Sequence, residues 1–262
     1  MWNKRTEELA VCGFNAVTAI GLFHPVIINR LFLRQDRFSS FTKVCKGLAE
    51  RKRPYKICED EELERICKSS HHQGVVAMIE LPIITGLTAG DLEQWASEGL
   101  TGLVLHSVGN DHNLGAMARS AAFFGAHFII ISDEDAEARL TTTAYRVAEG
   151  GMEHVVVRSV RDTAAFLQDA SRRLITIGAD IRARWRIDDL DVIVREQAKR
   201  IRGGGRRGPG FALVIGNEET GLPDEVKRRC SALMRIPGVG NMESLNAAHA
   251  ATLFLHAVFD YF

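Results

Sequence analysis

Apolar and polar positions alternate with two different periods along the first 80 residues. Residues 27–33 and 75–79 carry the short apolar or alternating runs of strands, whereas residues 12–23 have apolar positions at helical spacing. The predicted elements are a helix over 12–23, a strand over 27–33, a helix over 41–50, a strand over 55–58, a helix over 61–68 and a strand over 75–79. This alternation predicts a small α/β unit.

From about residue 100 onward, the pattern is a repeated strand followed in most cases by a helical stretch. The predicted strands cover residues 102–106, 127–131, 154–157, 174–178, 211–215 and 233–236. Near-continuous apolar strands alternating with helices predict a parallel sheet covered on both faces. In such sheets ligands gather beyond the carboxyl ends of the strands.

The pattern changes between the two regions, where one Pro and two Gly interrupt residues 81–90. We therefore predict a first domain over residues 1–80, a linker over 81–98 that contains a helix near 91–98, and a second domain over 99–262.

The composition is that of a soluble globular protein, with 46% hydrophobic and 25% charged residues in 262. Lys plus Arg and Asp plus Glu both number 33, so the net charge gives no reason to expect a polyanionic partner. The five cysteines are odd in number and have no CxxC spacing, which indicates reduced packing residues and no metal site. The absence of a signal peptide and of a bilayer-spanning run predicts a cytoplasmic protein.

The distribution of charge is more informative than its sum. Nine basic residues and two acidic ones lie between Arg30 and Lys56. They form either a solvated face balanced by the acidic stretch 59–64, or a phosphate-binding patch interleaved with Phe38, Phe41 and Tyr55. The basic, glycine-rich stretch 199–210 predicts a mobile loop, for which RNA contact is one of two open interpretations.

Three clusters of polar and small residues follow strands of the second region. The first begins a helix at Asn113 and places Arg119 on an otherwise apolar turn; the second is Gly216-Asn-Glu218. The third runs from Ile236-Pro237 through Gly240 to Ser244-Leu-Asn246. Each cluster alone can be explained by turn geometry or by a helix N-cap. Together they are better explained as one binding site at the carboxyl edge of the sheet.

The residues of these clusters resemble the three ordered motifs of the SpoU (TrmH-type) family of RNA ribose 2′-O-methyltransferases, in the α/β-knot superfamily. The motifs are Asn113-Leu-Gly-Ala-Met-Ala-Arg119, Leu213-Val-Ile-Gly-Asn-Glu218 with Gly221-Leu222, and Ile236-Pro237 through Gly240 to Ser244-Leu-Asn246. Residues 1–80, with Gly13-Phe-Asn-Ala-Val17 and His72-Gln-Gly-Val-Val-Ala77, resemble the L30e-like substrate-binding domain that often precedes this catalytic domain.

The resemblance implies a deep trefoil knot in the second domain, a homodimer formed through that domain, and an RNA substrate, either tRNA or rRNA. It implies that S-adenosylmethionine is held by the residues Ile215, Gly216, Asn217, Ile236, Pro237, Gly240 and Leu245. The catalytic residues that it implies are Asn113, Arg119, Glu218, Ser244 and Asn246, with Arg119 near the ribose hydroxyl as base or as anchor.

Two departures from the family pattern keep a second function open. The final helix begins Ala247-Ala-His-Ala250 where the family has a Val-rich run, and the glycine-rich insertion at 203–210 is long. The alternative is a non-catalytic RNA-binding or ribosome-assembly factor that retains the methyltransferase fold. A nucleotide-dependent α/β enzyme is disfavoured because no GxGxxG follows the first strand of the second domain.

Overall fold

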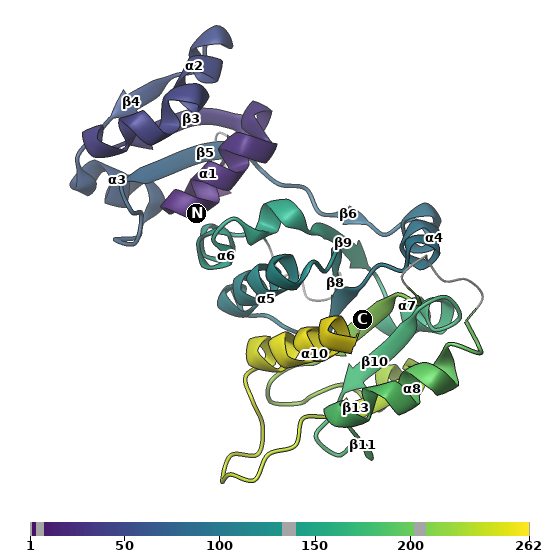
Figure 1. The fold of residues 1–262 in the computed structure, drawn as a ribbon. Helices are drawn as coiled ribbons and strands as arrows, with labels where there is room; N and C mark the ends of the chain where they lie inside the picture. The colour runs from purple at the N-terminus through teal and green to yellow at the C-terminus, as the bar shows by residue number, and fades with distance from the viewer. Residues whose placement is uncertain (1, 4–7, 133–139, 202–207, 262) are drawn as a thin grey trace. The chain divides into compact units, whose positions relative to one another are not determined.

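The computed structural model describes residues 2–3, 8–132, 140–201 and 208–261. The chain forms two compact units (Figure 1). The first comprises Met1–Ile83 together with Arg139–His154, and the second comprises Ile84–Ala138 together with Val155–Phe262. The region expected as the second domain therefore contributes one segment to the first unit. No helix in the described ranges is long and apolar enough to cross a bilayer.

The first unit is built on a five-stranded mixed sheet with strand order β1-β2-β5-β3-β4. Neighbouring strands are antiparallel except for the parallel pair β3 and β4. The strands are β1 (Trp2–Asn3), β2 (Glu8–Cys12), β3 (Ile28–Leu33), β4 (Tyr55–Ile57) and β5 (Val75–Glu80). The helices before residue 83 are α1 (Phe14–Phe23), α2 (Thr42–Glu50) and α3 (Asp60–Cys67).

Strand β2 is missing from the prediction, which began the first helix at Cys12. The residues of β2 run without a polar break into the apolar positions of α1, so periodicity alone does not separate the two elements. Gly13 separates them through its backbone, because its φ of 104° lies in a region that side chains other than glycine rarely adopt.

The first unit is completed by α6 (Thr142–Ala148) and a short 3-10 turn over Gly151–His154. The Thr142 hydroxyl donates to the Ala10 carbonyl of β2 at 2.6 Å, and the Asn15 amide of α1 donates to Glu149 at 2.9 Å. Glu153 lies 3.3 Å from His24, and burial raises the pKa of the Glu153 carboxyl to about 7. The segment is thus fastened to both a strand and a helix of the first unit.

The second unit contains an eight-stranded sheet in which every neighbouring pair is parallel, as the sequence predicted. The strand order is β11-β13-β10-β12-β7-β8-β9-β6. The strands are β6 (Thr85–Gly86), β7 (Gly102–Leu105), β8 (Phe128–Ser132), β9 (Val156–Val160), β10 (Ile175–Ala179), β11 (Trp185–Arg186), β12 (Phe211–Ile215) and β13 (Ala232–Arg235).

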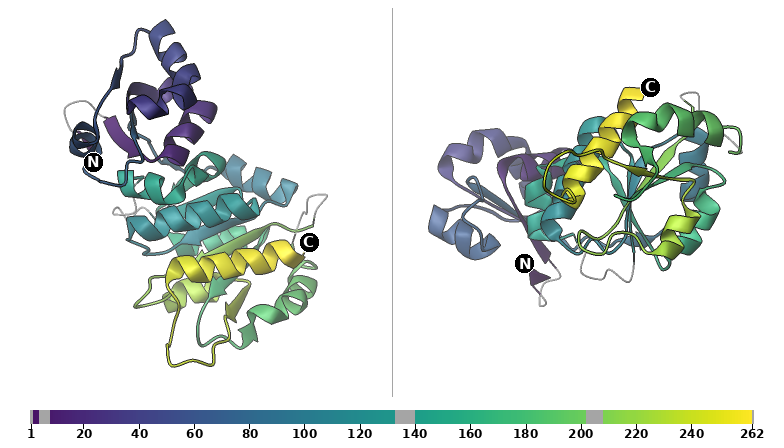
Figure 2. Two further views of the ribbon diagram at one scale, coloured as in Figure 1. Left: turned by 60° about the vertical axis from the view of Figure 1, so that its left-hand side comes forward. Right: turned by 90° about the horizontal axis from the view of Figure 1, so that it is seen from below.

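Helices cover both faces of this sheet (Figure 2). On one face α4 (Ala89–Glu98), α7 (Thr163–Ala170) and α9 (Asp224–Arg229) share a buried cluster with the strands. In that cluster Trp95 of α4 stacks on Phe128 of β8 at a ring distance of 4.0 Å, so the helix expected in the linker belongs to the core of the second unit. On the other face α10 (Ala247–Tyr261) packs against α5 (Asp111–Phe124), α8 (Leu190–Gln197) and β12.

Candidate functional site

Three side chains from distant parts of the second unit form one hydrogen-bonded cluster. The Asn113 amide, in the first turn of α5, donates to the Glu218 carboxylate that follows β12. The Asn246 amide, just before α10, donates to the Asn113 side-chain carbonyl at 3.0 Å. Because the strands are all parallel, the ends of β7, β12 and β13 lie at one edge of the sheet, and the cluster lies at that edge. We call it the Asn113–Glu218–Asn246 cluster.

Asn246 has two roles that the sequence presented as alternatives. Its side-chain oxygen accepts from the backbone N–H of Ala248 at 2.9 Å and so caps α10, while its amide nitrogen reaches Asn113. The N-cap of the final helix is therefore part of the cluster. Ser244, in the same motif, is exposed on the preceding loop.

The turn after β12 is tightly built. A Cβ atom on Gly216 would lie 2.5 Å from the carbonyl carbon of Gly221 and 2.7 Å from the nitrogen of Leu222, so only glycine fits there. The side-chain oxygen of Asn217 accepts from the backbone N–H of Glu219 and of Thr220, and its amide donates to the Ser107 carbonyl after β7 at 2.9 Å. Residues 216–222 are therefore held by the protein itself.

The connection after β13 has the opposite character. It leaves the strand through the half-buried residues Ile236 and Pro237 and projects as a long loop toward α10 (Figure 1). Residues 237–245 form no hydrogen bond with any other residue that the structure describes. Val239 and Met242 are almost fully exposed, Leu245 is half-exposed, and the backbone of Gly240 lies in open space.

The structure thus brings Asn113, Glu218 and Asn246 into contact and places Ile215, Gly216 and Asn217 next to them in the chain. Arg119 lies six residues after Asn113 in α5, with an exposed side chain. The roles of Arg119, Ser244 and the loop residues stay predictions. Of the basic loop 199–210, residues 202–207 lie outside the described part of the chain.

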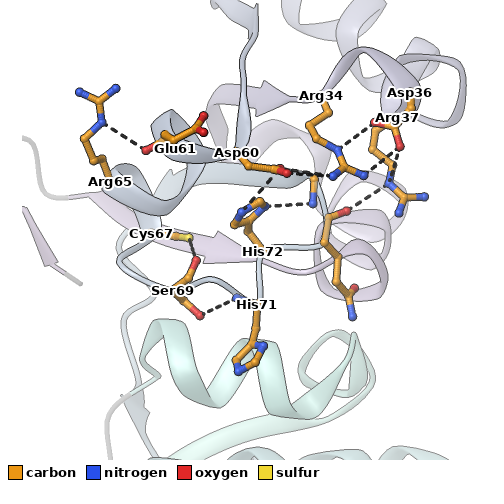
Figure 3. Close-up of polar contacts among 12 residues, drawn as sticks. Arg34, Asp36, Arg37, Asp60, Glu61, Arg65, Cys67, Ser69, His71 and His72 are labelled. Atoms are coloured by element: carbon orange, nitrogen blue, oxygen red, sulfur yellow. Dashed lines mark hydrogen bonds and ion pairs between the residues drawn. The ribbon is translucent and has the colours of Figure 1, made fainter.

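Most of the basic residues between Arg30 and Lys56 are paired in the structure. Arg34 lies between Asp36 and Asp60, with Nη2 and Nη1 at 2.9 and 3.1 Å from their carboxylates (Figure 3). The hydrogen bond from the Arg34 guanidinium lowers the pKa of the Asp36 carboxyl. Further ion pairs join Arg30 to Glu8, Arg37 to Asp36, Arg53 to Glu80 and Lys56 to Glu62.

Fewer cations of this region lack an ion pair than the sequence suggested. Lys43 and Lys46 project from the exposed side of α2, Lys52 follows that helix, and Arg51 donates to the Pro25 carbonyl at 2.9 Å. Within the described ranges, no acidic side chain forms an ion pair with these three lysines. The phosphate-binding interpretation therefore reduces to one face of α2, with the Phe38 and Tyr55 rings 6.3 Å apart near it.

Comparison with known sequences gives two matches that together span most of the chain. Residues 101–256 match the SpoU rRNA methylase family, and residues 10–83 match the RNA 2′-O ribose methyltransferase substrate-binding family. The first match covers the Asn113–Glu218–Asn246 cluster, and the second covers the sheet of the first unit except β1 and the start of β2.

Individual relatives match over almost their full length. A 23S rRNA (guanosine-2′-O-)-methyltransferase RlmB from Acinetobacter baylyi is 33% identical over 249 residues, 93% of this chain and 94% of the relative. The protein of the same name from Nitrosomonas europaea is 28% identical over 256 residues, 97% and 92% of the two chains.

Among solved structures, the SpoU methyltransferase AviRb from Streptomyces viridochromogenes, crystallised with AdoMet, superposes with a TM-score of 0.69. The superposition covers 98% of this chain and 91% of AviRb at 20% sequence identity. Together with the eight-stranded parallel sheet, this likeness confirms the predicted fold class, an α/β-knot domain preceded by a smaller α/β domain.

Proposed function

The chain belongs to the SpoU rRNA methylase family, and from this premise we propose that it methylates the ribose 2′-hydroxyl of a guanosine in 23S ribosomal RNA. It is an S-adenosylmethionine-dependent RNA 2′-O-methyltransferase. The choice of 23S rRNA over tRNA is supported by the relatives from Acinetobacter baylyi and Nitrosomonas europaea, which carry that activity in their names and match over more than nine tenths of both chains. We propose a cytoplasmic location as well, because the proposed substrate is ribosomal RNA.

The observation that carries the proposal is the Asn113–Glu218–Asn246 cluster. Its members are 105 and 133 residues apart in the chain, and each comes from a different family motif. A protein that kept only the fold as an RNA-binding scaffold would not need these three polar side chains in mutual contact at the carboxyl edge of the sheet. The intact cluster favours an active enzyme over the non-catalytic alternative.

The residues around the cluster fit the expected cofactor. The C=O groups of residues 237–245 and the backbone N–H groups of residues 238–245 have no hydrogen-bond partner in the described part of the chain, and Val239, Met242 and Leu245 expose apolar surface beside them. Free backbone groups next to apolar side chains suit a ligand that combines an adenosine with a largely apolar methionine chain. We assign its binding to Ile215, Gly216, Asn217, Ile236, Pro237, Gly240 and Leu245, mainly through their backbone.

When bound, S-adenosylmethionine supplies a methyl group already activated by its sulfonium centre. The protein must then align the ribose oxygen with that methyl group and manage the hydroxyl proton. An arginine side chain does not lose its proton in proteins, so Arg119 acts as an anchor for a phosphate or for the developing alkoxide.

The Asn113–Glu218–Asn246 cluster has a positioning role in this scheme. The Asn113 amide occupies one carboxylate oxygen of Glu218, which fixes the carboxylate and leaves its second oxygen to accept from an incoming hydroxyl or guanidinium donor. Ser244 and Asn246 shape the same side of the site from the loop before α10.

The test combines a substrate map with a matched pair of variants. Ribose-methylation mapping of cellular RNA with and without the gene should show the loss of one guanosine site in 23S rRNA. In the purified protein, Arg119→Ala should abolish methyl transfer to a 23S rRNA transcript and leave the affinity for S-adenosylmethionine within about twofold. Arg172→Ala, at the opposite edge of the sheet, should retain full activity.

An unchanged methylation map in every growth condition would support the non-catalytic alternative. Robust methyl transfer by Arg119→Ala would remove Arg119 from the catalytic residues, while a lost site in tRNA would keep the reaction and change the substrate.

We also propose a homodimer formed by the α5 and α10 side of the second unit. Phe123 of α5 is 81% exposed and Leu253 of α10 is 41% exposed, and large apolar side chains on adjacent packed helices are typical of a protein interface. Light scattering should give about twice the chain mass of 29.0 kDa. The first unit, with Lys43 and Lys46 on α2, then serves as the RNA-binding part of each chain.

A further inference from the structure

A row of arginines lies at the carboxyl edge of the parallel sheet, in the stretch that follows β10. Arg182, Arg184 and Arg186 are exposed, whereas Ala183 between the first two is buried and Trp185 between the last two is half-buried. The sequence Ile-Arg-Ala-Arg-Trp-Arg has the period of two that produces such an alternation. We call Arg182, Arg184 and Trp185 the β10 turn patch.

The turn that carries this patch is rigid without help from the arginine side chains. The Asp180 carboxylate accepts from the Arg182 backbone N–H at 2.9 Å and lies 2.9 Å from the Lys227 ammonium of α9. The Asp180 backbone donates to the Met234 carbonyl of β13 and accepts from the N–H of Ala183, both at 3.0 Å. The arginine side chains are therefore available for a role other than holding the turn.

The position of the turn links the patch to the methyltransferase site. Strand β10 lies between β12 and β13 and is parallel to both. The chain therefore leaves β10 at the same edge where Gly216 follows β12 and Ile236 follows β13. The patch is thus beside the segments assigned to the cofactor, in the unit that carries the Asn113–Glu218–Asn246 cluster.

The two guanidinium groups of the patch are not paired with any carboxylate that the structure describes. Arg186 pairs with Asp188 at 2.8 Å, but Arg182 and Arg184 form no ion pair with any acidic residue in the described ranges. The Arg184 guanidinium lies over the Trp185 ring, 5.0 Å from its centroid. Charged side chains on an edge strand can prevent another sheet from pairing with it. That role does not explain why these residues are arginines, because β11 is only two residues long and a charge of either sign would prevent pairing.

We propose that Arg182, Arg184 and Trp185 bind the RNA strand beside the nucleotide that is methylated. The guanidinium groups take phosphate oxygens, and the Arg184 and Trp185 pair offers a surface on which an unstacked base can lie. Ribose methylation needs a nucleotide that the enzyme can reach, and proteins recognise RNA sequence mainly in unpaired segments of this kind. The inference rests on the proposed function, to which it adds a second RNA contact outside the substrate-binding unit.

The first experiment compares two double variants with equal loss of charge. Arg182→Gln with Arg184→Gln removes the patch, and Arg172→Gln with Arg173→Gln removes two arginines before β10, at the opposite edge of the sheet. Binding to an in vitro transcript of 23S rRNA should weaken about 10-fold at 0.1 M salt for the patch variant and less than about twofold for the control. The slope of log K against log salt should fall by roughly 1.4 to 1.8, since each phosphate contact contributes about 0.7 to 0.9.

The second experiment tests base stacking. Trp185→Ala should weaken binding of a 20-nucleotide polyuridine strand about 10-fold, and Trp185→Phe should restore most of the affinity because a phenyl ring keeps the stacking surface. Calorimetric titration with S-adenosylmethionine checks that every variant keeps its fold and its cofactor site.

The outcomes separate this inference from the proposed function. One outcome is equal RNA affinity and equal salt slope for the two double variants, with a wild type that methylates 23S rRNA. That result would overturn the RNA-binding role of the patch and leave the proposed function standing. Reduced methylation by the patch variant at unchanged RNA affinity would also overturn it. A wild type that neither binds nor methylates RNA would overturn both.

Discussion

The two connections that form the expected cofactor site differ in how they are held. Residues 216–222, after β12, are fixed by the side chain of Asn217 and by a glycine with no room for a Cβ atom. Residues 237–245, after β13, make no hydrogen bond to the described remainder of the chain and expose Val239 and Met242. In the proposed site, one connection is therefore held by the protein's own hydrogen bonds, and the other offers unbonded backbone groups to the ligand.

The residue types explain this difference. Asn217 carries both an acceptor and a donor on a short side chain, and it uses both on nearby backbone groups. In the other connection, Pro237 removes a backbone donor, and Gly238 and Gly240 add backbone freedom without any close neighbour. A ligand that binds the free backbone groups of this loop replaces the hydrogen bonds that the chain does not supply.

The largest expected effect comes from Gly216→Ala. The new methyl group would lie 2.5 Å from the Gly221 carbonyl carbon, and backbone cannot move aside as a flexible side chain can. We expect a loss of roughly 3 kcal/mol in the free energy of unfolding, and cofactor affinity at least about 100-fold weaker. Denaturant unfolding and calorimetric titration measure the two quantities. A variant with wild-type stability would show that the β12 turn is less constrained than its geometry indicates.

Asn217→Ala should have the next largest effect, because it removes the acceptor for two backbone N–H groups and the donor to Ser107. We expect roughly 2 kcal/mol of destabilisation, measured by thermal denaturation. Asn217→Asp is the matched control, since it keeps the acceptor oxygen and loses only the donor. An Asp variant as unstable as the Ala variant would assign the effect to the single bond with Ser107.

Amide hydrogen exchange directly tests the connection after β13, residues 237–245. Without cofactor, the backbone amides of residues 238–245 should exchange close to the rate of an unfolded peptide. With S-adenosylmethionine at ten times its dissociation constant, exchange should slow about 11-fold, equivalent to about 1.4 kcal/mol. The backbone N–H groups of Glu219 and Thr220 should be protected in both states. Equal protection of both connections without cofactor would contradict the comparison.

The smallest effect on stability is expected for Gly240→Ala. A Cβ atom there meets nothing within 4 Å, so unfolding should change by less than about 0.5 kcal/mol. Compared with Gly216→Ala, this variant makes the same chemical change in the other half of the site. A large loss of stability in the protein without cofactor would mean that the loop already packs against the unit.

Six of the eight strands of the second unit could be predicted, because most are short apolar runs that end at a glycine or a polar residue. Strands β6 and β11 could not, because each is only two residues long and too short for a pattern to show. The motif residues could be predicted by resemblance, but the bonds among them could not. The sequence offered Asn246 as a helix cap or as a site residue, whereas its side chain serves both roles because the oxygen and the nitrogen point to different partners.

For the basic residues of the first unit, counting charges in one stretch of sequence does not predict which of them are paired. Arg30, Arg53 and Lys56 pair with Glu8, Glu80 and Glu62, of which the first two come from the neighbouring strands β2 and β5. A window from Arg30 to Lys56 contains none of these acids. The two-residue alternation of Arg182, Arg184 and Arg186 is the reverse case, since it is visible in the sequence but no neighbouring motif indicates a function for it.

The placement of α6 in the first unit has a consequence for how the protein folds during its own synthesis. Residues up to Ile83 emerge first, but the helix that donates to β2 and the turn that carries Glu153 follow roughly 70 residues later. At about 5 to 20 residues per second, the first unit waits roughly 4 to 14 seconds for its final segment. During that interval the nascent chain exposes the surface of β2 and α1 that α6 later covers. A chaperone acting on this protein would therefore bind at the amino-terminal unit while β7, α5 and β8 are still being synthesised.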